Sequence, residues 1–276
     1  MNVESIKTSD NHSLKYAYVK NDASKPWIVF IIPFALKTDL AKPFFDFFSS
    51  HYNIVTWESR LILDDANEKP EHEFFNVEHH VQDLLDVMNA LEIKQAHLVG
   101  YCSGAGIALC AINRAPDRFE NLVLAHGEYT LLNESSCTTQ FALDMDGLLS
   151  LAASSETRAK LVFDKIQSER METDPNRPDG LDLPFSKLNY LTKYADTYTA
   201  YKSEDFTQLA KQVGHKTLVL TGERDIQANV SSSQRIQNLI ESSEIYVDPV
   251  GDHYGVLRPN SKTLVKIWNY LCVHKS

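Results

Sequence analysis

Short runs of apolar, largely β-branched residues alternate with helix-forming segments along most of this chain. The runs are WIVFII (27–32), NIVTW (53–57), AHLVGY (96–101), NLVLAH (121–126), KTLVLTG (216–222) and EIYVDPV (244–250). Most of them lack the alternation of apolar and polar residues that is typical of a strand with one solvent-exposed face, so they are predicted to be strands buried on both sides. Strands that alternate with helices form right-handed βαβ units, which predicts an α/β fold with a mostly parallel central sheet flanked by helices.

Helical periods fill the intervals between these runs. The clearest is residues 76–93, where apolar residues recur three or four positions apart along one face. The other helical segments are expected at 39–50, 104–116, 232–243 and 260–273. The first twenty residues instead alternate apolar and polar positions around the turn SDNHS, as an antiparallel hairpin does.

The alternation of strand and helix fails between residues 129 and 205. A structureless segment of that length is unusual in a compact domain, so a helical cap, or lid, is predicted there. The core of the domain would then consist of residues 1–128 and 206–276. The cap carries four tyrosines at helical spacing, Tyr190, Tyr194, Tyr198 and Tyr201. They are expected to pack the cap onto the core, and a pocket wall is the alternative.

The charge balance disfavours a nucleic-acid partner. The formal net charge is -10 and no cluster of Lys and Arg stands out, whereas phosphate binding draws its affinity from such clusters. The N-terminal segment lacks the basic patch and apolar run of a signal peptide, and no stretch approaches the roughly 18 apolar residues of a membrane span. We therefore expect a cytoplasmic protein with neither nucleic acid nor membrane as a partner.

The four cysteines are predicted to be separate free thiols. Cys102, Cys110, Cys137 and Cys272 lie far apart in the sequence, without a CxxC motif or a Cys/His pair. That spacing argues against a zinc site and against a disulfide framework. We expect neither a metal nor a cofactor.

One junction between a strand and a helix carries a cysteine between two glycines. The sequence LVGYCSGAG (98–106) sets Cys102 at the centre of a Gly-x-Cys-x-Gly frame. This pattern is typical of a nucleophile elbow, a sharp turn that holds its central residue in a strained conformation. Side chains in place of Gly100 and Gly104 would collide with the strand and the helix. A buried thiol that only packs the turn is the alternative reading of Cys102.

This junction resembles the α/β-hydrolase superfamily, in which nucleophile, acid and base follow one another along the chain. The resemblance covers nearly the whole chain outside the cap. It implies Asp225, which follows the strand at 216–222, as the acid. It implies His253, which follows the last strand, as the base. Glu128 also follows a strand at the same edge of the sheet and is the alternative acid.

An activated thiol needs a base and a site for the oxyanion. His253, oriented by Asp225, would take the proton of Cys102, and the helix N-terminus would further stabilise the thiolate. The resemblance implies an oxyanion hole built from the backbone N–H of Ser103 and one N–H from the loop after the first central strand. That loop reads IIPFALKTD where the superfamily usually shows His-Gly. Ala35 is the candidate donor, and Phe34 is the alternative.

A cysteine nucleophile favours thioester substrates. A thiolate that adds to an oxygen ester is the better leaving group, so the intermediate collapses backwards, whereas on a thioester the two sulfurs leave about equally well. The predicted activity is therefore that of a thioesterase or acyltransferase that acts on an acyl thioester of coenzyme A or of an acyl or peptidyl carrier protein. It would proceed through an acyl-Cys102 intermediate, as in polyketide, nonribosomal peptide or fatty-acyl assembly.

Two groups of the superfamily that carry a cysteine are similar to parts of this chain. GYCSGAG and GDHYGVLRPN distantly resemble segments of polyhydroxyalkanoate synthases, which are much longer. Dienelactone hydrolases use Cys, Asp and His as well, although they lack a large cap. The alternative functions are therefore a hydrolase or cyclase of a small lactone or ester, and a non-catalytic ligand-binding protein on the same fold.

Four residues are predicted to line the substrate pocket: Phe34, Glu58, Arg60 and Tyr101. Glu58 and Arg60 end a central strand at the edge where active sites of this architecture form. Arg60 would meet a phosphate or carboxylate of the substrate, and a solvated ion pair of the two side chains is the alternative.

The cap carries basic residues that could meet an acidic carrier protein. They are Arg158, Lys160, Lys165 and Arg170. A solvated helix face is the alternative reading, and the sequence gives no indication of the oligomeric state.

Overall fold

The computed structural model describes residues 1–65, 76–129, 131, 137–168 and 177–273. Among them, eight strands form one sheet in the order β1-β2-β4-β3-β5-β6-β7-β8. The strands are β1 (Asn2–Lys7), β2 (Ser13–Val19), β3 (Trp27–Ile31), β4 (Asn53–Trp57), β5 (Ala96–Tyr101), β6 (Phe119–Ala125), β7 (Thr217–Gly222) and β8 (Ser243–Asp248). From β4 to β8 all neighbouring strands are parallel.

The antiparallel hairpin predicted for the first twenty residues is confirmed. β1 pairs with β2 in register from Asn2 opposite Tyr18 to Lys7 opposite Ser13. β2 also pairs antiparallel with β4, which attaches the hairpin to the parallel part of the sheet. The hairpin thus forms one edge of the sheet, and β8 lies at the other edge.

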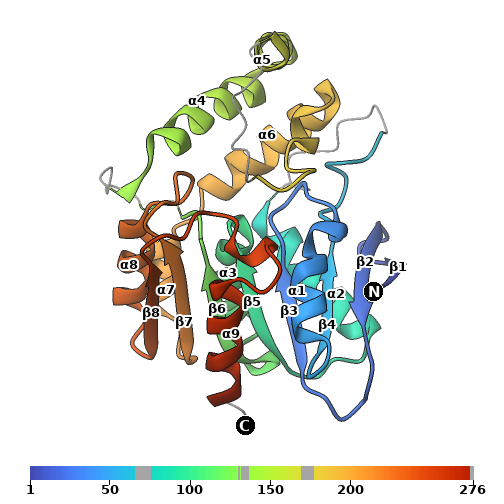
Figure 1. The fold of residues 1–276 in the computed structure, drawn as a ribbon. Helices are drawn as coiled ribbons and strands as arrows, with labels where there is room; N and C mark the ends of the chain where they lie inside the picture. The colour runs from blue at the N-terminus through green and yellow to red at the C-terminus, as the bar shows by residue number, and fades with distance from the viewer. Residues whose placement is uncertain (66–75, 130, 132–136, 169–176, 274–276) are drawn as a thin grey trace.

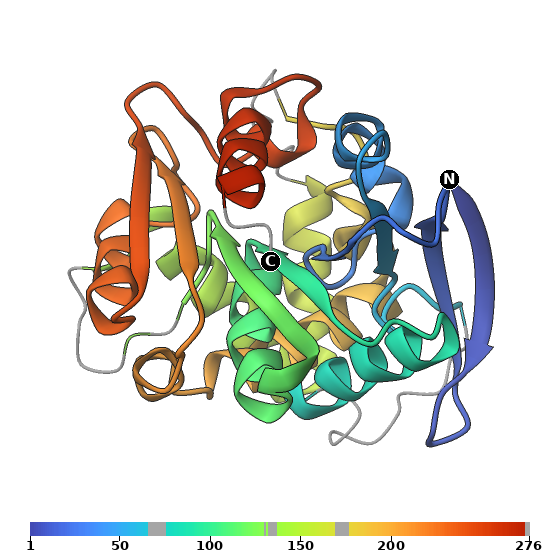
Figure 2. The ribbon, with the colours of Figure 1, turned by 90° about the horizontal axis from the view of Figure 1, so that it is seen from below.

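Helices cover both faces of the sheet (Figure 2). On one face lie α1 (Lys42–Phe48) and α9 (Lys262–Val273), whose buried residues share a core with the sheet. On the other face lie α2 (Val77–Ala90), α3 (Ser103–Arg114), α7 (Phe206–Lys211) and α8 (Val230–Leu239). The α/β sandwich with a mostly parallel sheet, predicted from the alternation of strands and helices, is confirmed.

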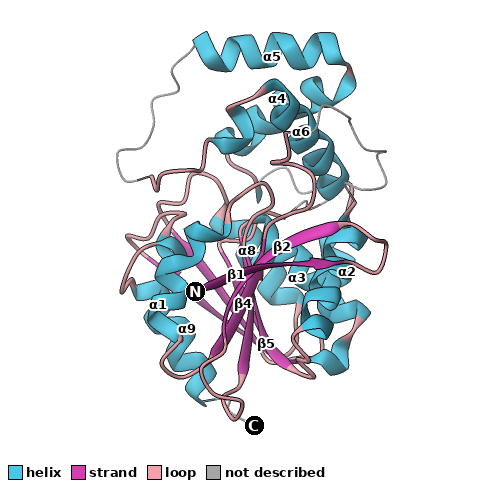
Figure 3. Cartoon of the chain, turned by 90° about the vertical axis from the view of Figure 1, so that its right-hand side faces the viewer, coloured by secondary structure: helices cyan, strands magenta, loops and turns pink. Residues whose placement is uncertain are grey.

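Three helices form a separate layer above the carboxyl ends of the strands (Figures 1 and 3). They are α4 (Gln140–Ser154), α5 (Glu156–Ser168) and α6 (Leu188–Lys202), and α4 packs against both of the others. They lie between β6 and β7 in the chain, in the interval for which the sequence predicts a cap. The boundaries at residues 129 and 205 stay a prediction.

Short 3-10 helices complete the described structure at Thr38–Ala41, Pro116–Arg118, Leu183–Phe185 and Gly255–Leu257. Within the described ranges, no helix combines the length and the apolar character needed to cross a membrane.

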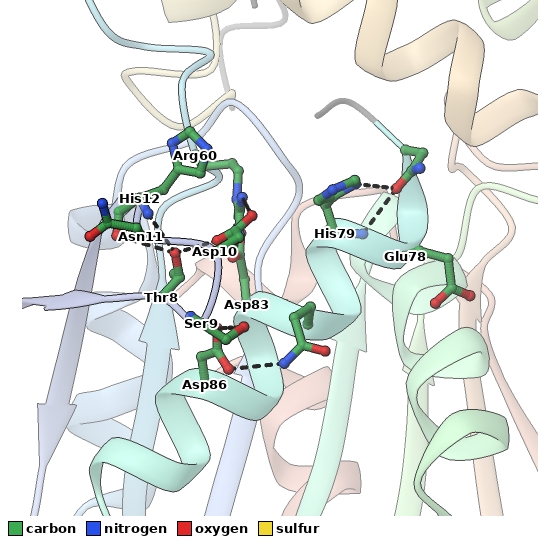
Figure 4. A network of polar contacts seen from close by, with 12 residues as sticks. Thr8, Ser9, Asp10, Asn11, His12, Arg60, Glu78, His79, Asp83 and Asp86 are labelled. Carbon is green, nitrogen blue, oxygen red and sulfur yellow. Dashed lines mark hydrogen bonds and ion pairs between the residues drawn. The ribbon is translucent and has the colours of Figure 1, made fainter. Parts of the chain in front are cut away.

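The prediction that Arg60 lines the substrate pocket is wrong. Its side chain is 1% exposed and lies beside Asp10 in the turn of the β1–β2 hairpin (Figure 4). The guanidinium binds the carboxylate of Asp83 on α2, with Nε 2.9 Å from Oδ2, and it also contacts Asp10 in the turn. A second link joins the turn to α2, because the backbone N–H of Ser9 donates to Asp86 Oδ2 at 2.7 Å. Arg60 therefore fixes the hairpin to α2.

The charges of this network stabilise one another. Burial opposes ionisation of Asp10, but the hydrogen bonds from Arg60 and Thr8 outweigh it and hold the pKa of Asp10 well below its usual range. Asp83 is fully buried, and its burial raises its pKa to about 6 in spite of the guanidinium. Asp83 thus depends on Arg60 for the stability of its charge.

Replacing Arg60 by Ala should destabilise the fold by about 3–5 kcal/mol, because it leaves the buried carboxylate of Asp83 without its partner. Urea unfolding followed by circular dichroism measures the change. The double variant Arg60→Met with Asp83→Leu removes both charges and should cost less than Arg60→Ala. A double variant that is less stable than Arg60→Ala would contradict this account.

Candidate active site

Cys102 lies at the tip of the turn that joins β5 to α3. Its backbone has φ 54° and ψ -123°, a conformation that residues with a side chain rarely adopt. A Cβ atom on Gly100 would lie 2.4 Å from the carbonyl oxygen of Gly104. One on Gly104 would lie 2.2 Å from the carbonyl oxygen of Ile31 in β3. Both glycines are required because strand and helix approach each other so closely at this turn.

Two loops at the carboxyl edge of the sheet bring an imidazole and a carboxylate to this turn. Asp225 follows β7, His253 follows β8, and His253 Nδ1 lies 2.8 Å from Asp225 Oδ2. The other carboxylate oxygen of Asp225 accepts the backbone N–H groups of Gln227 and Ala228, each at 2.9 Å. The imidazole of His253 acts on the Cys102 thiol both as a charge and as a hydrogen-bond partner. Since Nδ1 faces Asp225, Nε2 is the atom that faces the thiol.

Burial and neighbouring charges shift the pKa values of these three side chains in opposite directions. Burial opposes the carboxylate of Asp225, but the charge of His253 and hydrogen bonds from His126 and His253 hold the pKa of Asp225 well below its usual range. Burial likewise opposes the imidazolium, but the Asp225 carboxylate raises the pKa of His253 well above its usual value. Burial raises the pKa of the Cys102 thiol, and His253 opposes that rise. The site therefore strengthens the imidazole as a base.

Glu128, the alternative acid, has another partner. Its Oε1 accepts the hydroxyl of Tyr198 on α6 at 2.7 Å. Asp225, and not Glu128, accepts the hydrogen bond from His253 Nδ1.

The sequence analysis missed a second histidine on the same carboxylate. His126 directly follows β6, and its Nδ1 lies 3.0 Å from Asp225 Oδ2. The signal was present, because His126 ends a central strand beside the two that precede Cys102 and Asp225. The ligand atoms of His126, Asp225 and His253 lie within 4.8 Å of one another, a spacing that would suit a metal ion. Here the two imidazole Nδ1 atoms hydrogen bond to the carboxylate that they share.

The loop after β3 supplies a backbone N–H near the turn. Phe34 lines the cavity in front of Cys102, and its N–H points to Ser103 Oγ at 3.4 Å. The backbone N–H of Ser103 interacts with the Cys102 sulfur. Ala35 is 1% exposed and is not among the cavity-lining residues, whereas Phe34 is. Ala35 has φ 64°, a glycine-like conformation at the place where the superfamily usually shows glycine.

A cavity of about 640 Å³ opens in front of Cys102. It lies between the carboxyl edge of the sheet and the cap, and Phe34, Tyr101 and Cys102 belong to its floor. The hydroxyl of Tyr101 donates to the carbonyl oxygen of His253 at 3.0 Å, which ties the loop after β8 to the strand before the turn.

The expectation that Glu58 lines this cavity is also wrong, as it is for Arg60. Neither residue is among those that form the described cavity wall. Glu58 accepts Lys15 Nζ at 2.9 Å and the backbone N–H of Thr38 at 3.2 Å. The two side chains therefore pair with other residues and not with each other.

The tyrosines of α6 divide between two roles. Tyr194 and Tyr198 line the cavity, as the alternative reading proposed. The hydroxyl of Tyr190 donates to Asp65 at 2.8 Å, and that of Tyr201 donates to the carbonyl oxygen of Glu128. Tyr190 and Tyr201 thus fix α6 to the core.

The chain belongs to the alpha/beta hydrolase fold family, whose model matches residues 59–258. Among curated proteins it is 26% identical over 233 residues to an L-allo-isoleucyltransferase of Pseudomonas savastanoi pv. glycinea, with 83% of this chain and 80% of the relative covered. It is 22% identical over 231 residues to 3-oxoadipate enol-lactonase 1 of Acinetobacter baylyi, with 83% and 82% covered.

Solved structures show the same fold. An enol-lactonase from Burkholderia xenovorans superposes with a TM-score of 0.69 at 15% identity, over 98% of this chain and all of that one. An esterase from Exiguobacterium antarcticum superposes with a TM-score of 0.72 at 15% identity, over 97% and 98% of the two chains. The family and its relatives support an enzyme of the hydrolase or acyltransferase type.

Replacing Asp225 by Asn should shift the alkylation of Cys102 to higher pH. The carboxylate raises the pKa of His253, so its loss lowers that pKa, and a weaker base takes the thiol proton only at higher pH. The curve of iodoacetamide alkylation rate against pH, measured by peptide mass spectrometry, should move up by about one pH unit or more.

The matched control is Asp252→Asn, since Asp252 neighbours His253 in sequence but pairs with Arg258. This control should keep the wild-type curve. Superposable curves for Asp225→Asn and the wild type would contradict the role given to Asp225.

Proposed function

We propose that the protein transfers or hydrolyses the acyl group of a thioester through an acyl-Cys102 intermediate. One observation carries this proposal: a cysteine at the tip of a strained turn lines a cavity and has an imidazole–carboxylate pair behind it. A thiol that only packed the turn would need neither the cavity nor the pair.

In this proposal, His253 takes the thiol proton onto Nε2 and the thiolate adds to the thioester carbonyl. The negative charge moves to the carbonyl oxygen, where the N–H groups of Ser103 and Phe34 would stabilise it. The intermediate collapses, the carbon–sulfur bond to the donor breaks, and the departing thiolate takes the proton back from His253. A second thiol, or water, then repeats the sequence on the acyl-Cys102 thioester.

The choice of cysteine favours a thioester donor. Attack on a thioester produces two sulfurs of similar leaving ability, so the intermediate partitions forward as readily as backward. The product, acyl-Cys102, preserves the energy of the thioester for a second transfer. A serine at this position would make a more stable oxygen ester and lose that advantage for transfer.

The relatives support two versions of this chemistry. The transferase from Pseudomonas savastanoi is named for the movement of an L-allo-isoleucyl group, which favours acyl transfer here. The enol-lactonases found among both the sequences and the structures favour a second candidate, cysteine-dependent opening of a small lactone. We give priority to acyl transfer because a thiolate nucleophile and a thioester are matched in leaving ability.

The donor would be a thioester of coenzyme A or of a carrier protein. On α5, Lys160 is paired with Asp164 at 3.0 Å, and Arg158 donates to Ser154 at 3.2 Å. These contacts favour the reading of that helix as a solvated face. Arg170 lies outside the described residues, so a basic docking patch for a carrier protein stays a prediction.

Incubation with acyl thioesters of N-acetylcysteamine should add one acyl group to the wild-type protein. Intact-protein mass spectrometry detects the added mass, and digestion assigns it to Cys102. Cys102→Ala should show no adduct, while Cys110→Ala, which removes a buried thiol in α3, should load as the wild type does. An adduct that persists in Cys102→Ala would remove Cys102 from the mechanism.

The wild type should also prefer a thioester to the matched ethyl ester by more than about tenfold in loading rate, because the thiolate of Cys102 leaves more readily than ethoxide but about as readily as a donor thiolate. Cys102→Ser should narrow this ratio, because an alkoxide formed at the turn leaves no better than ethoxide. Equal loading rates for the two esters on the wild type would favour the lactone or ester hydrolase instead.

A further inference from the structure

One carboxylate lies in the wall of the cavity beside the nucleophile. Glu128 follows β6, which is the neighbour of the strand that delivers Cys102, and the backbone N–H of Glu128 donates to the carbonyl oxygen of Cys102 at 3.4 Å. Both residues line the same cavity. The cavity wall also contains the apolar residues Phe34, Phe141 and Met145, together with the charged residues Arg177 and Asp182.

Glu128 belongs to a cluster with more negative than positive charge. Its Oε1 lies 3.9 Å from Lys202 Nζ, which is closer to Asp146 Oδ1, at 3.3 Å. The hydroxyl of Tyr198 contacts both carboxylates. Within the described part of the chain, two carboxylates thus share one ammonium group, and Oε2 of Glu128 accepts no hydrogen bond.

The negative charge of Glu128 is unfavourable in the enzyme without substrate. Burial raises the pKa of Glu128, which shows that its charge is poorly compensated. After burial and the opposing influence of His253, the charge of Glu128 contributes to raising the pKa of the Cys102 thiol. A cation bound at Oε2 would relieve both effects, because it would compensate the carboxylate and favour the thiolate.

We propose that Glu128 binds the ammonium group of an α-aminoacyl substrate and selects such acyl groups over acyl groups without an amine. The α-nitrogen is two bonds from the carbonyl carbon that Cys102 attacks, so a cation on that atom must lie close to Cys102. The backbone contact with Cys102 places Glu128 close to the nucleophile. Its Oε2 atom, which accepts no hydrogen bond within the described residues, can accept one from the ammonium group. This inference rests on the proposed function of Cys102.

The test compares two thioesters of N-acetylcysteamine that share one carbon skeleton, L-valyl and 3-methylbutanoyl. They differ only by the α-amino group, and both have uncharged thiol leaving groups. Loading of Cys102 is followed by intact-protein mass spectrometry under single-turnover conditions. Each rate is divided by the rate of the same thioester with free mercaptoethanol, which removes the greater intrinsic reactivity of the aminoacyl compound.

The wild type should load the valyl group at least about tenfold faster than the 3-methylbutanoyl group on this normalised scale, as expected for a charged hydrogen bond. In Glu128→Gln, the ratio of the two rates should fall to within about threefold of one. A ratio is used because general damage to the site lowers both rates together.

Asp146→Asn is the matched control. It removes one negative charge from the same cluster and from the same tyrosine hydroxyl, but Asp146 is not among the residues that line the cavity. The preference for the valyl group should persist in this variant. Loss of the preference in Asp146→Asn as large as that in Glu128→Gln would overturn the proposal and assign the effect to the cluster as a whole.

The thiol supplies a second readout that needs no substrate. Glu128→Gln should shift the alkylation of Cys102 by iodoacetamide to lower pH, because one neighbouring negative charge is lost. A shift to higher pH, or none, would contradict the charge coupling between the two residues.

The remaining outcomes separate this inference from the function on which it rests. Equal normalised loading of both thioesters by the wild type, or an unchanged ratio in Glu128→Gln, would overturn the role of Glu128 and leave acyl-Cys102 formation intact. Failure of both thioesters to modify Cys102 would overturn the proposed function and, with it, this inference.

Discussion

The close approach of β3, β5 and α3 at one turn is the constraint on which the rest of the site depends. Gly100 and Gly104 let the helix begin directly above the strands, with backbone atoms where a Cβ would otherwise sit. Cys102 adopts a strained conformation as a result, and it lines the cavity at the carboxyl edge of the sheet. Every other functional group of the site is placed relative to that sulfur.

Hydrogen bonds, more than solvent, stabilise the negative charge of Asp225, the carboxylate that orients His253. Asp225 is buried, yet its carboxylate accepts two backbone N–H groups and lies against two imidazoles. A buried charge with this many donors is stabilised by fixed dipoles, which do not have to reorganise when a proton moves. The carboxylate of Glu128 is the contrast, because it is half-buried, accepts fewer hydrogen bonds and opposes the thiolate beside it.

Much of this arrangement could be predicted from the sequence. Short continuous apolar runs predicted the six parallel strands, and the Gly-x-Cys-x-Gly frame predicted the turn and its strained residue. The predictions that proved wrong concern side chains at strand ends. Arg60 was expected in the pocket because it ends a central strand, but two carboxylates from α2 and the hairpin turn bind it in the core. His126 ends another such strand and was overlooked, although it shares the carboxylate of Asp225.

The sequence by itself determined the layers of the fold and the position of the cysteine, because hydrophobic periodicity and the glycines of a tight turn are local properties of the chain. The tertiary structure alone decided which acid meets His253 and which of the α6 tyrosines line the cavity. Those choices depend on the relative placement of segments that are far apart in the sequence, such as Tyr101 and His253, which are 152 residues apart. No local pattern records that placement, since it arises only when the sheet, its loops and the cap pack against one another.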